Sequence, residues 1–156
     1  MGRGFKVISL DEWKKQLPEE LYQNITLPKR STALSAGYDF YIPYDLVINP
    51  NEEVVIKTGI KSYMNSGEVL LIFVRSSLGF KYNARLKNQT GIIDADYYDN
   101  PSNEGHIMVA IKNEGSKPIE LKVGDRFVQG VFVNYLISDD DSSTETRTGG
   151  IGSTNK

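Results

Sequence analysis

The sequence contains no cysteine and only one histidine among its 156 residues. The missing cysteines exclude disulfide bonds, thiolate nucleophiles and cysteine-ligated zinc sites. One histidine, His106, cannot supply the histidine pair of an HExxH zinc motif, and a Ser-His-Asp triad would have to use that residue. We expect His106 to be an ordinary strand residue rather than a base. Any chemistry must therefore rest on carboxylates, arginine, lysine, tyrosine, hydroxyls and backbone amides.

An excess of charge and long apolar runs are missing as well. The formal net charge is −2, so the chain has no surplus of cations to neutralise polymeric nucleic acid. The longest apolar run covers residues 69–74, whereas a membrane span needs about 20 residues. No apolar stretch follows the basic residues 1–6, which argues against a signal peptide. We expect a cytoplasmic protein with neither nucleic-acid nor membrane partners.

The order of local patterns indicates one helix followed by strands. Ser9 and Glu12 match a capping box, and apolar residues with helical spacing follow, so a helix is expected over about residues 10–16, before Pro18. The rest of the chain alternates short apolar runs with turn residues, a pattern typical of an antiparallel sandwich, jelly roll or barrel. The expected strands cover residues 38–42, 54–56, 69–74, 107–111, 119–123 and 127–136.

The composition changes near the C-terminus. Residues 139–156 contain one large apolar side chain, Ile151, and their charges sum to −2. That composition predicts disorder for the isolated segment. An arginine followed by glycines and hydroxyls is also suited to wrap a phosphate group. We therefore expect a single β domain over residues 1–138 and a flexible lid segment over residues 139–156.

Several short segments carry groups that could do chemistry, although none is specific alone. Asp94 beside a glycine-rich, aromatic turn is either a turn carboxylate or a general base for water. Arg75 and two serines at the end of an apolar run form either an anion site or a strand-ending turn. Asp39 stands at the entry to another strand, and Arg126 fits a structural ion pair as well as a ligand.

Taken in order, these segments resemble the five motifs of the trimeric dUTP diphosphatases (dUTPases). The resemblance covers about residues 30–155, and its third and fifth motifs are the most specific. It implies an all-β fold, a dUTPase-like β-clip or jelly-roll barrel with one short N-terminal helix, assembled as a homotrimer with shared active sites. The matching segments are residues 36–39, residues 75–77, Asn88 with residues 91–97, residues 124–129 and residues 147–154.

The resemblance implies hydrolysis of dUTP to dUMP and pyrophosphate, with Mg²⁺ on the triphosphate. This reaction limits uracil incorporation into DNA and supplies dUMP. By the match, Asp94 activates the water that attacks the α-phosphorus in line. Tyr97 packs under the deoxyribose and excludes a 2′-hydroxyl. Asp39 orients waters on the Mg²⁺ rather than binding the metal directly.

The other residues implied by the resemblance bind substrate in three groups. The uracil edge would be read by Asn88, Gly91 and Ile93. The phosphate oxygens would be held by Arg75, Ser76, Ser77 and Gln129. The C-terminal segment would close over the nucleotide through Arg147, Ile151, Gly152, Ser153 and Thr154.

The chain departs from the family pattern at several positions. Ser77 stands where glycine is common, and Asp99 stands where the family usually turns at glycine. Gly105 comes later, so the expected hairpin carries a longer tip at residues 99–104, which would reshape the pocket rim. Ile151 replaces the usual phenylalanine over the uracil and loses aromatic stacking of about 0.5–1.5 kcal/mol. A weaker lid with retained catalysis is expected.

Two alternatives from other classes stay open at this point. A dCTP deaminase has a similar fold, but that branch uses a catalytic glutamate on the strand that matches residues 107–111, where this chain has no acid. A jelly-roll binding or regulatory module that has kept the pocket is the second alternative. The sequence names no protein partner for it.

Overall fold

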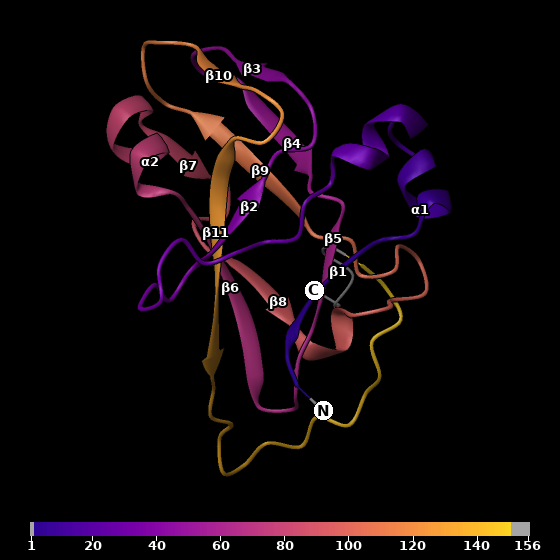
Figure 1. The fold of residues 1–156 in the computed structure, drawn as a ribbon. Helices are drawn as coiled ribbons and strands as arrows, with labels where there is room; N and C mark the ends of the chain where they lie inside the picture. Colours follow the sequence, from indigo (N-terminus) through magenta and orange to yellow (C-terminus); the bar gives the residue numbers. More distant parts are fainter. Residues whose placement is uncertain (1, 151–156) are drawn as a thin grey trace.

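Antiparallel strands make up most of residues 2–150, the part of the chain that the computed structural model describes (Figure 1). The strands are β1 (Gly4–Val7), β2 (Tyr38–Tyr41), β3 (Leu46–Ile48), β4 (Glu53–Lys57), β5 (Ile60–Tyr63), β6 (Glu68–Val74), β7 (Ala84–Leu86), β8 (Gly91–Asp94), β9 (Met108–Asn113), β10 (Ile119–Leu121) and β11 (Arg126–Asn134). The helical elements are α1 (Leu10–Lys14), α2 (Ser76–Tyr82) and the 3-10 helices η1 (Glu19–Asn24) and η2 (Ala95–Tyr97). The all-β class predicted from the sequence is confirmed.

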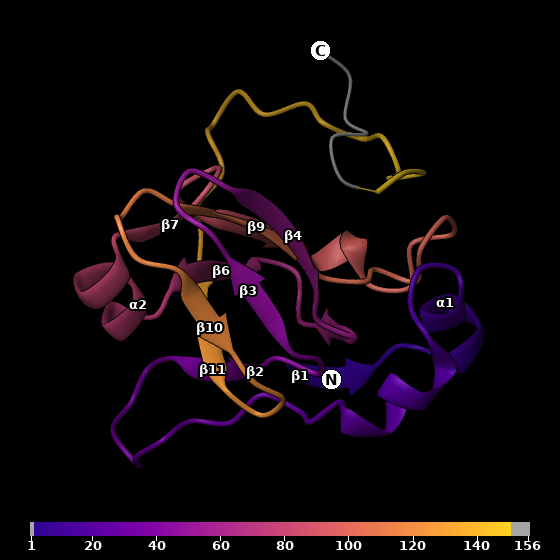
Figure 2. The same cartoon turned by 90° about the horizontal axis from the view of Figure 1, so that it is seen from above.

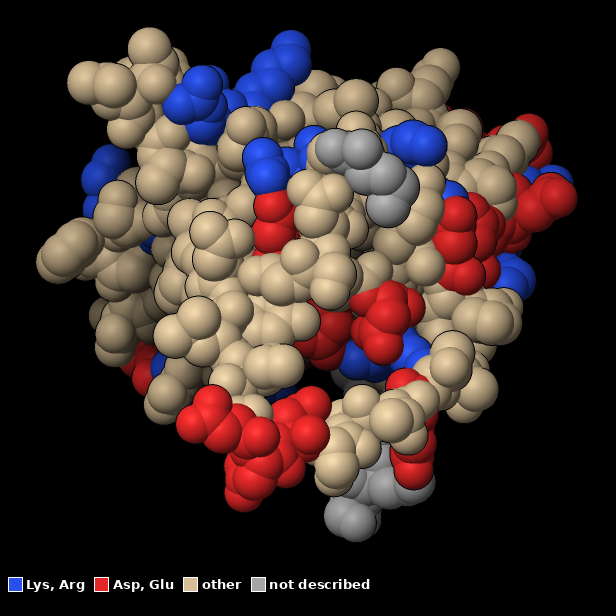
Figure 3. Space-filling view, turned by 90° about the horizontal axis from the view of Figure 1, so that it is seen from below, with Lys and Arg blue, Asp and Glu red and all other residues tan. Residues whose placement is uncertain are grey.

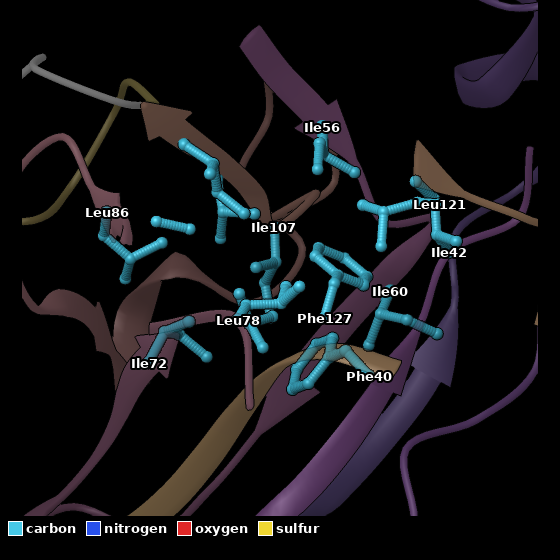
Figure 4. Packing of buried hydrophobic residues seen from close by; sticks show 14 of the residues in the cluster. Phe40, Ile42, Ile56, Ile60, Ile72, Leu78, Leu86, Ile107, Leu121 and Phe127 are labelled. Carbon is cyan, nitrogen blue, oxygen red and sulfur yellow. The ribbon is translucent and has the colours of Figure 1, made fainter. Parts of the chain in front are cut away.

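Two larger sheets enclose the core. One has the strand order β2-β11-β6-β8 and the other the order β4-β9-β7, while β1 pairs with β5 and β10 pairs with β3. Side chains from both larger sheets meet in one apolar cluster, as Figure 4 shows for Phe40 and Phe127 from one sheet and Ile56 and Leu86 from the other. These four side chains are fully or almost fully buried. Burial of each contributes about 1.5–3 kcal/mol to folding.

The alternation within the strands explains which residues reach the core. In β9, buried and half-buried positions alternate, so Val109 and Ile111 point inward. A strand turns successive side chains to opposite faces, so the residues between them lie on the other face of the sheet. The sequence pattern predicts the core side of this strand for that reason.

Helix α2 was not predicted, since residues 75–77 were expected to be a strand-ending turn or an anion site. Its first turn carries no capping signal, because Arg75 occupies the N-cap position without a side-chain hydrogen bond. The helix buries Leu78 and ends at Asn83, whose φ of 54° is left-handed. Tertiary packing of Leu78, rather than local propensity, accounts for the helix.

The expected hairpin around residues 99–104 is wrong. Strand β8 pairs with β6, whereas β9 pairs with β4 and β7. The chain between β8 and β9 therefore connects the two larger sheets instead of joining two neighbouring strands. We call residues 98–106 the connecting loop. His106, expected in a strand, ends this loop just before β9.

The N-terminal helix is confirmed, and it supports the connecting loop. The Ser9 hydroxyl accepts a hydrogen bond from the Glu12 amide at 3.1 Å, which is the predicted N-cap. The Ser9 amide and hydroxyl both donate to the Glu104 carboxylate of the loop. Trp13 is buried, and its ring lies 6.4 Å from the His106 ring. None of the helices formed by residues 2–150 is long and apolar enough to cross a membrane.

The segment after β11 forms no helix or strand up to residue 150. Residues 135–146 are mostly exposed. In Figures 1 and 2 the segment, drawn in yellow, runs back along the molecule and reaches the connecting loop. The predicted division into a domain up to residue 138 and a lid from residue 139 stays a prediction.

Candidate active site

A cavity of about 640 Å³ lies between the two larger sheets. Its walls come from β7, β8, β9, η2 and the turn at residues 87–90, and Arg147 and Gly150 of the C-terminal segment line it as well. Six predicted site residues line this one cavity: Asn88, Gly91, Ile93, Asp94, Tyr97 and Arg147. The structure thus brings together the residues predicted for the base, the sugar and the reacting water.

Asp94 is the last residue of β8 and lies in the cavity wall with a half-exposed side chain (50 %). Its Oδ2 accepts a hydrogen bond of 2.7 Å from Arg147 Nη2, and Asp96 Oδ1 accepts one of 2.8 Å from Arg147 Nε. The Asp96 hydrogen bond raises the pKa of the Arg147 guanidinium, with burial acting in the opposite direction. The candidate base is therefore paired with a permanent cation from the C-terminal segment.

Figure 3 shows Asp and Glu side chains gathered toward the lower edge of the view, with Lys or Arg atoms among them beside a hollow. The two carboxylates that Arg147 contacts are about half-exposed to water, so each ion pair is weak, worth about 0–1 kcal/mol. Arg147 can therefore exchange Asp94 for a more strongly charged ligand at little cost.

Tyr97 is buried in the wall of the cavity, and two hydrogen bonds fix its hydroxyl. Its hydroxyl donates to the His106 carbonyl at 2.7 Å and accepts from Asn103 Nδ2 at 2.9 Å. Burial raises the pKa of the Tyr97 hydroxyl, while the Asn103 hydrogen bond lowers it. The guanidinium carbon of Arg147 lies 5.9 Å from the ring centre. A ring held this firmly presents a fixed flat surface to the cavity.

Asp39, Arg75, Arg126 and Gln129 form a second cluster, and they do not line the cavity. Asp39 is buried in β2, with Arg75 Nε 3.3 Å from its Oδ1 and Arg126 Nη1 3.4 Å from its Oδ2. Gln129 of β11 is the register partner of Asp39 in β2. The Gln129 side chain lies against Gly37, where an added Cβ would be only 2.2 Å from its Oε1. Two arginines and an amide beside a helix start are suited to hold an anion.

The predicted phosphate ligands Ser76 and Ser77 belong to this second cluster. They open α2, immediately after Arg75. The prediction of an anion site here was made for a turn, and the residues instead stand in a helical first turn. The role of these hydroxyls stays a prediction.

Strand β6 separates the two clusters along its length. Its Val69 pairs with Asp94, and Arg75 follows its last residue, Val74. The six-residue separation corresponds to roughly 20 Å at about 3.3 Å per residue. Side chains that hold neighbouring phosphates of one nucleotide cannot stand that far apart. The predicted site residues of one copy thus form two separate clusters, one around Asp94 and one around Arg75.

Sequence reasoning missed several residues of the cavity. The wall from β9, formed by Met108, Val109 and Ala110, carries no motif and becomes visible only from strand pairing. Asp96 of η2, which accepts a hydrogen bond from Arg147, was not among the predicted site residues either. The predicted residues Ile151, Gly152, Ser153 and Thr154 lie outside the described residues.

Comparison with known proteins gives consistent matches over most of the chain. The family model described as dUTPase matches residues 23–155. A protein of Lactococcus lactis named deoxyuridine 5′-triphosphate nucleotidohydrolase is 42 % identical over 156 residues, covering 97 % of each chain. The crystal structure of dUTPase from Streptococcus mutans matches with a TM-score of 0.72 and 43 % identity, covering 87 % of this chain and 98 % of that one.

A more distant structural match shows the fold alone. The dUTPase from phage phi11 of Staphylococcus aureus, solved as a mutant with a structural Mg(II) ion, matches with a TM-score of 0.69 and 21 % identity. The match covers 93 % of this chain and 98 % of the phage chain.

Proposed function

This chain belongs to the dUTPase family, and on that premise we propose that it hydrolyses dUTP to dUMP and pyrophosphate. The observation that carries the proposal is the position of Asp94: a half-exposed carboxylate at the edge of a largely apolar cavity that Asn88 and Tyr97 also line. An apolar cavity with a few convergent polar groups suits a planar base and its sugar. The carboxylate stands where such a ligand would meet solvent.

In the proposed reaction, Asp94 acts on a water molecule. The carboxylate accepts a proton from the water as its oxygen bonds to the α-phosphorus, and the bond to the bridging oxygen of the β-phosphate breaks. Pyrophosphate leaves with that oxygen and dUMP stays in the cavity. The fixed Tyr97 ring lies under the deoxyribose, and the backbone around Gly91 and Ile93 with Asn88 binds the uracil edge.

Mg²⁺ is proposed to arrive with the triphosphate. It would neutralise phosphate charge, and it prefers phosphate, carboxylate and water oxygens. In residues 2–150 no group of three or more His, Asp or Glu side chains is placed to hold a metal ion, which fits a cation bound mainly by substrate and water. The Asp39 carboxylate faces Arg75 and Arg126, so its clearest role is to orient these cations. A contact of Asp39 with metal-bound water stays a prediction.

We also propose that three copies of the chain share each active site. The separation of the Asp94 and Arg75 clusters along β6 supports this, because a neighbouring copy can bring its Arg75 cluster to the Asp94 cavity. Static light scattering of the purified protein should give about three times 17.5 kDa. A monomer mass with full activity would contradict shared sites.

The C-terminal segment is proposed to act as a lid. Arg147 donates a hydrogen bond to Asp94, and a bound triphosphate would offer the guanidinium a stronger anionic partner. Transfer of Arg147 to the phosphates would free Asp94 for its water. The same movement would exclude solvent from the reacting centre.

The test is pyrophosphate release from dUTP, dCTP, dTTP and UTP with Mg²⁺ present. We expect release from dUTP and a loss of about 10²–10⁴-fold for Asp94→Asn. Asp45→Asn, an exposed aspartate that does not line the cavity, is the matched control and should keep full turnover. Full activity of Asp94→Asn would refute the assignment. Ammonia release from dCTP would favour a deaminase, although β9 carries no acid.

A further inference from the structure

The connecting loop receives the end of the described C-terminal segment. Figures 1 and 2 both show the last yellow residues beside the salmon loop between η2 and β9. Asn100 of this loop is almost completely buried (2 % exposed), although it lies in a surface turn. A buried amide needs partners for both its donor and its acceptor. The partners on one side are peptide groups of the C-terminal segment.

The side-chain amide of Asn100 lies within hydrogen-bond distance of the peptide groups of Gly149 and Gly150. One orientation of its amide directs Nδ2 to the Gly149 carbonyl oxygen at 3.1 Å and lets Oδ1 accept from the Gly150 amide at 3.3 Å and from the Ser102 hydroxyl at 2.8 Å. In the other orientation Nδ2 donates to Ser102 Oγ at 2.8 Å and to Asn103 Oδ1 at 3.0 Å. In the first orientation the side-chain amide recognises backbone through one donor and one acceptor, which requires no particular side chain in the segment.

Asn103 makes the second contact from the same loop. Its Nδ2 donates to the Tyr97 hydroxyl and would lie 2.8 Å from a Cβ built on Gly150. Real Cβ atoms do not approach that closely, so position 150 needs a glycine while Asn103 stays on Tyr97. The close approach joins the segment to the ring that lines the cavity.

Hydrogen bonds from Ser9, before α1, and from Lys61 of β5 hold the connecting loop in place. Glu104 accepts from Ser9 at the start of α1, and Lys61 of β5 donates to Asp99 at 2.6 Å and to Glu104 at 3.3 Å. By contrast, residues 135–146 make few contacts within the described part of the chain. The segment is therefore held at Arg147, Gly149 and Gly150 rather than along its length.

We propose that the connecting loop is the seat of the lid: Asn100 binds the Gly149–Gly150 peptide groups and thereby positions Arg147 over the cavity. This inference rests on the proposed function for its catalytic consequence, but the seat itself does not depend on turnover. Asn100 and Asn103 act as positioning residues, since they touch the lid and Tyr97 rather than the reacting atoms.

Trypsin reports on the seat directly, because it cleaves after Arg147. The Arg147 side chain is only 14 % exposed when seated, so cleavage requires release of the segment. Mass spectrometry of untreated and trypsin-treated protein follows the loss of residues 148–156. For Asn100→Asp, which keeps the size but replaces the donor by a negative oxygen, we expect cleavage to become roughly three- to tenfold faster. Asn51→Asp, in an exposed turn, is the matched control.

Gly150→Ala alters the same contact on the side of the C-terminal segment, so the sequence of the connecting loop stays unchanged. It should also accelerate cleavage, whereas Gly2→Ala, where a Cβ meets nothing within 4 Å, should not. Both seat variants should raise the KM for dUTP more than they lower kcat. Unchanged cleavage in Asn100→Asp and Gly150→Ala would overturn the seat, even with normal dUTP hydrolysis. Faster cleavage of the two variants, combined with a parent protein that does not hydrolyse dUTP, would uphold the seat and refute the proposed function.

Discussion

Replacing His106 by glutamine should remove much of the acid sensitivity of this protein. The imidazole is buried, and its Nε2 accepts a hydrogen bond from the Gly59 amide at 2.9 Å. Protonation of Nε2 would turn this acceptor into a donor facing a donor. Burial is the main cause that lowers the pKa of His106 to about 4, with Lys57 lowering it and Glu104 raising it.

The sign and size of the effect follow from linkage. The unfolded chain takes up the proton near the ordinary pKa of 6.5, and the folded chain does so near 4. Between these values the unfolded state binds more protons, so stability falls as the pH falls from about 6.5 to about 4. A difference of this size corresponds to about 3 kcal/mol. Glutamine keeps an acceptor for the Gly59 amide and cannot be protonated in this range.

Two measurements check the prediction. Because His106 is the only histidine, NMR of untagged protein carrying ¹³C-labelled histidine gives one titrating imidazole. Its midpoint should lie near 4 in the folded protein. Urea unfolding at fixed protein concentration should show a loss of stability between pH 7 and pH 4.5 that is smaller in His106→Gln than in the parent chain. A folded-state midpoint near 6.5, or parallel pH profiles, would refute the reasoning.

Three further changes test the fold and the site. Gly105→Ala places a Cβ 2.3 Å from the Tyr97 carbonyl oxygen at a φ of 78°, so it should lower the Tm by several degrees, and Gly67→Ala, with φ 85° but open space, should lower it less. Removing residues 147–156 should lower kcat/KM for dUTP and leave the thermal midpoint unchanged, as calorimetry can show. Arg75→Ala should weaken binding of an α,β-imido dUTP analogue about tenfold or more in calorimetric titration and leave dUMP binding nearly unchanged; equal losses for both ligands would contradict its phosphate role.

Sequence patterns were sufficient for the fold class because the hydrophobic alternation is local. In β9 each inward residue can be identified from its neighbours alone, because buried and half-buried positions alternate. The helix α2 was missed since Arg75 offers no cap and Gly79 weakens the helix, and only the burial of Leu78 explains it. The hairpin expected around residue 100 failed because partner choice between strands depends on the whole sheet, which no short segment encodes.

The candidate site was predictable in its residues but not in its arrangement. The order of motifs identified Asp94, Tyr97 and Arg147, and these three do lie together. Nothing in the spacing indicated that Arg75 stands at the far end of β6 from Asp94. The register of β6 with β8 decides that, and register is set by long-range pairing. No sequence pattern pointed to Asn100, because its proposed partners in the C-terminal segment are the backbone groups of Gly149 and Gly150.

The two ends of β6 also have a genetic consequence. If one copy supplies Asp94 and another supplies Arg75, a chain lacking only Asp94 and a chain lacking only Arg75 each retain what the other has lost. Refolding the two inactive variants together in equal amounts would then regenerate about a quarter of all sites, since each site draws its two contributions from different copies. Two defective alleles expressed in one cell would complement each other without any recombination between them.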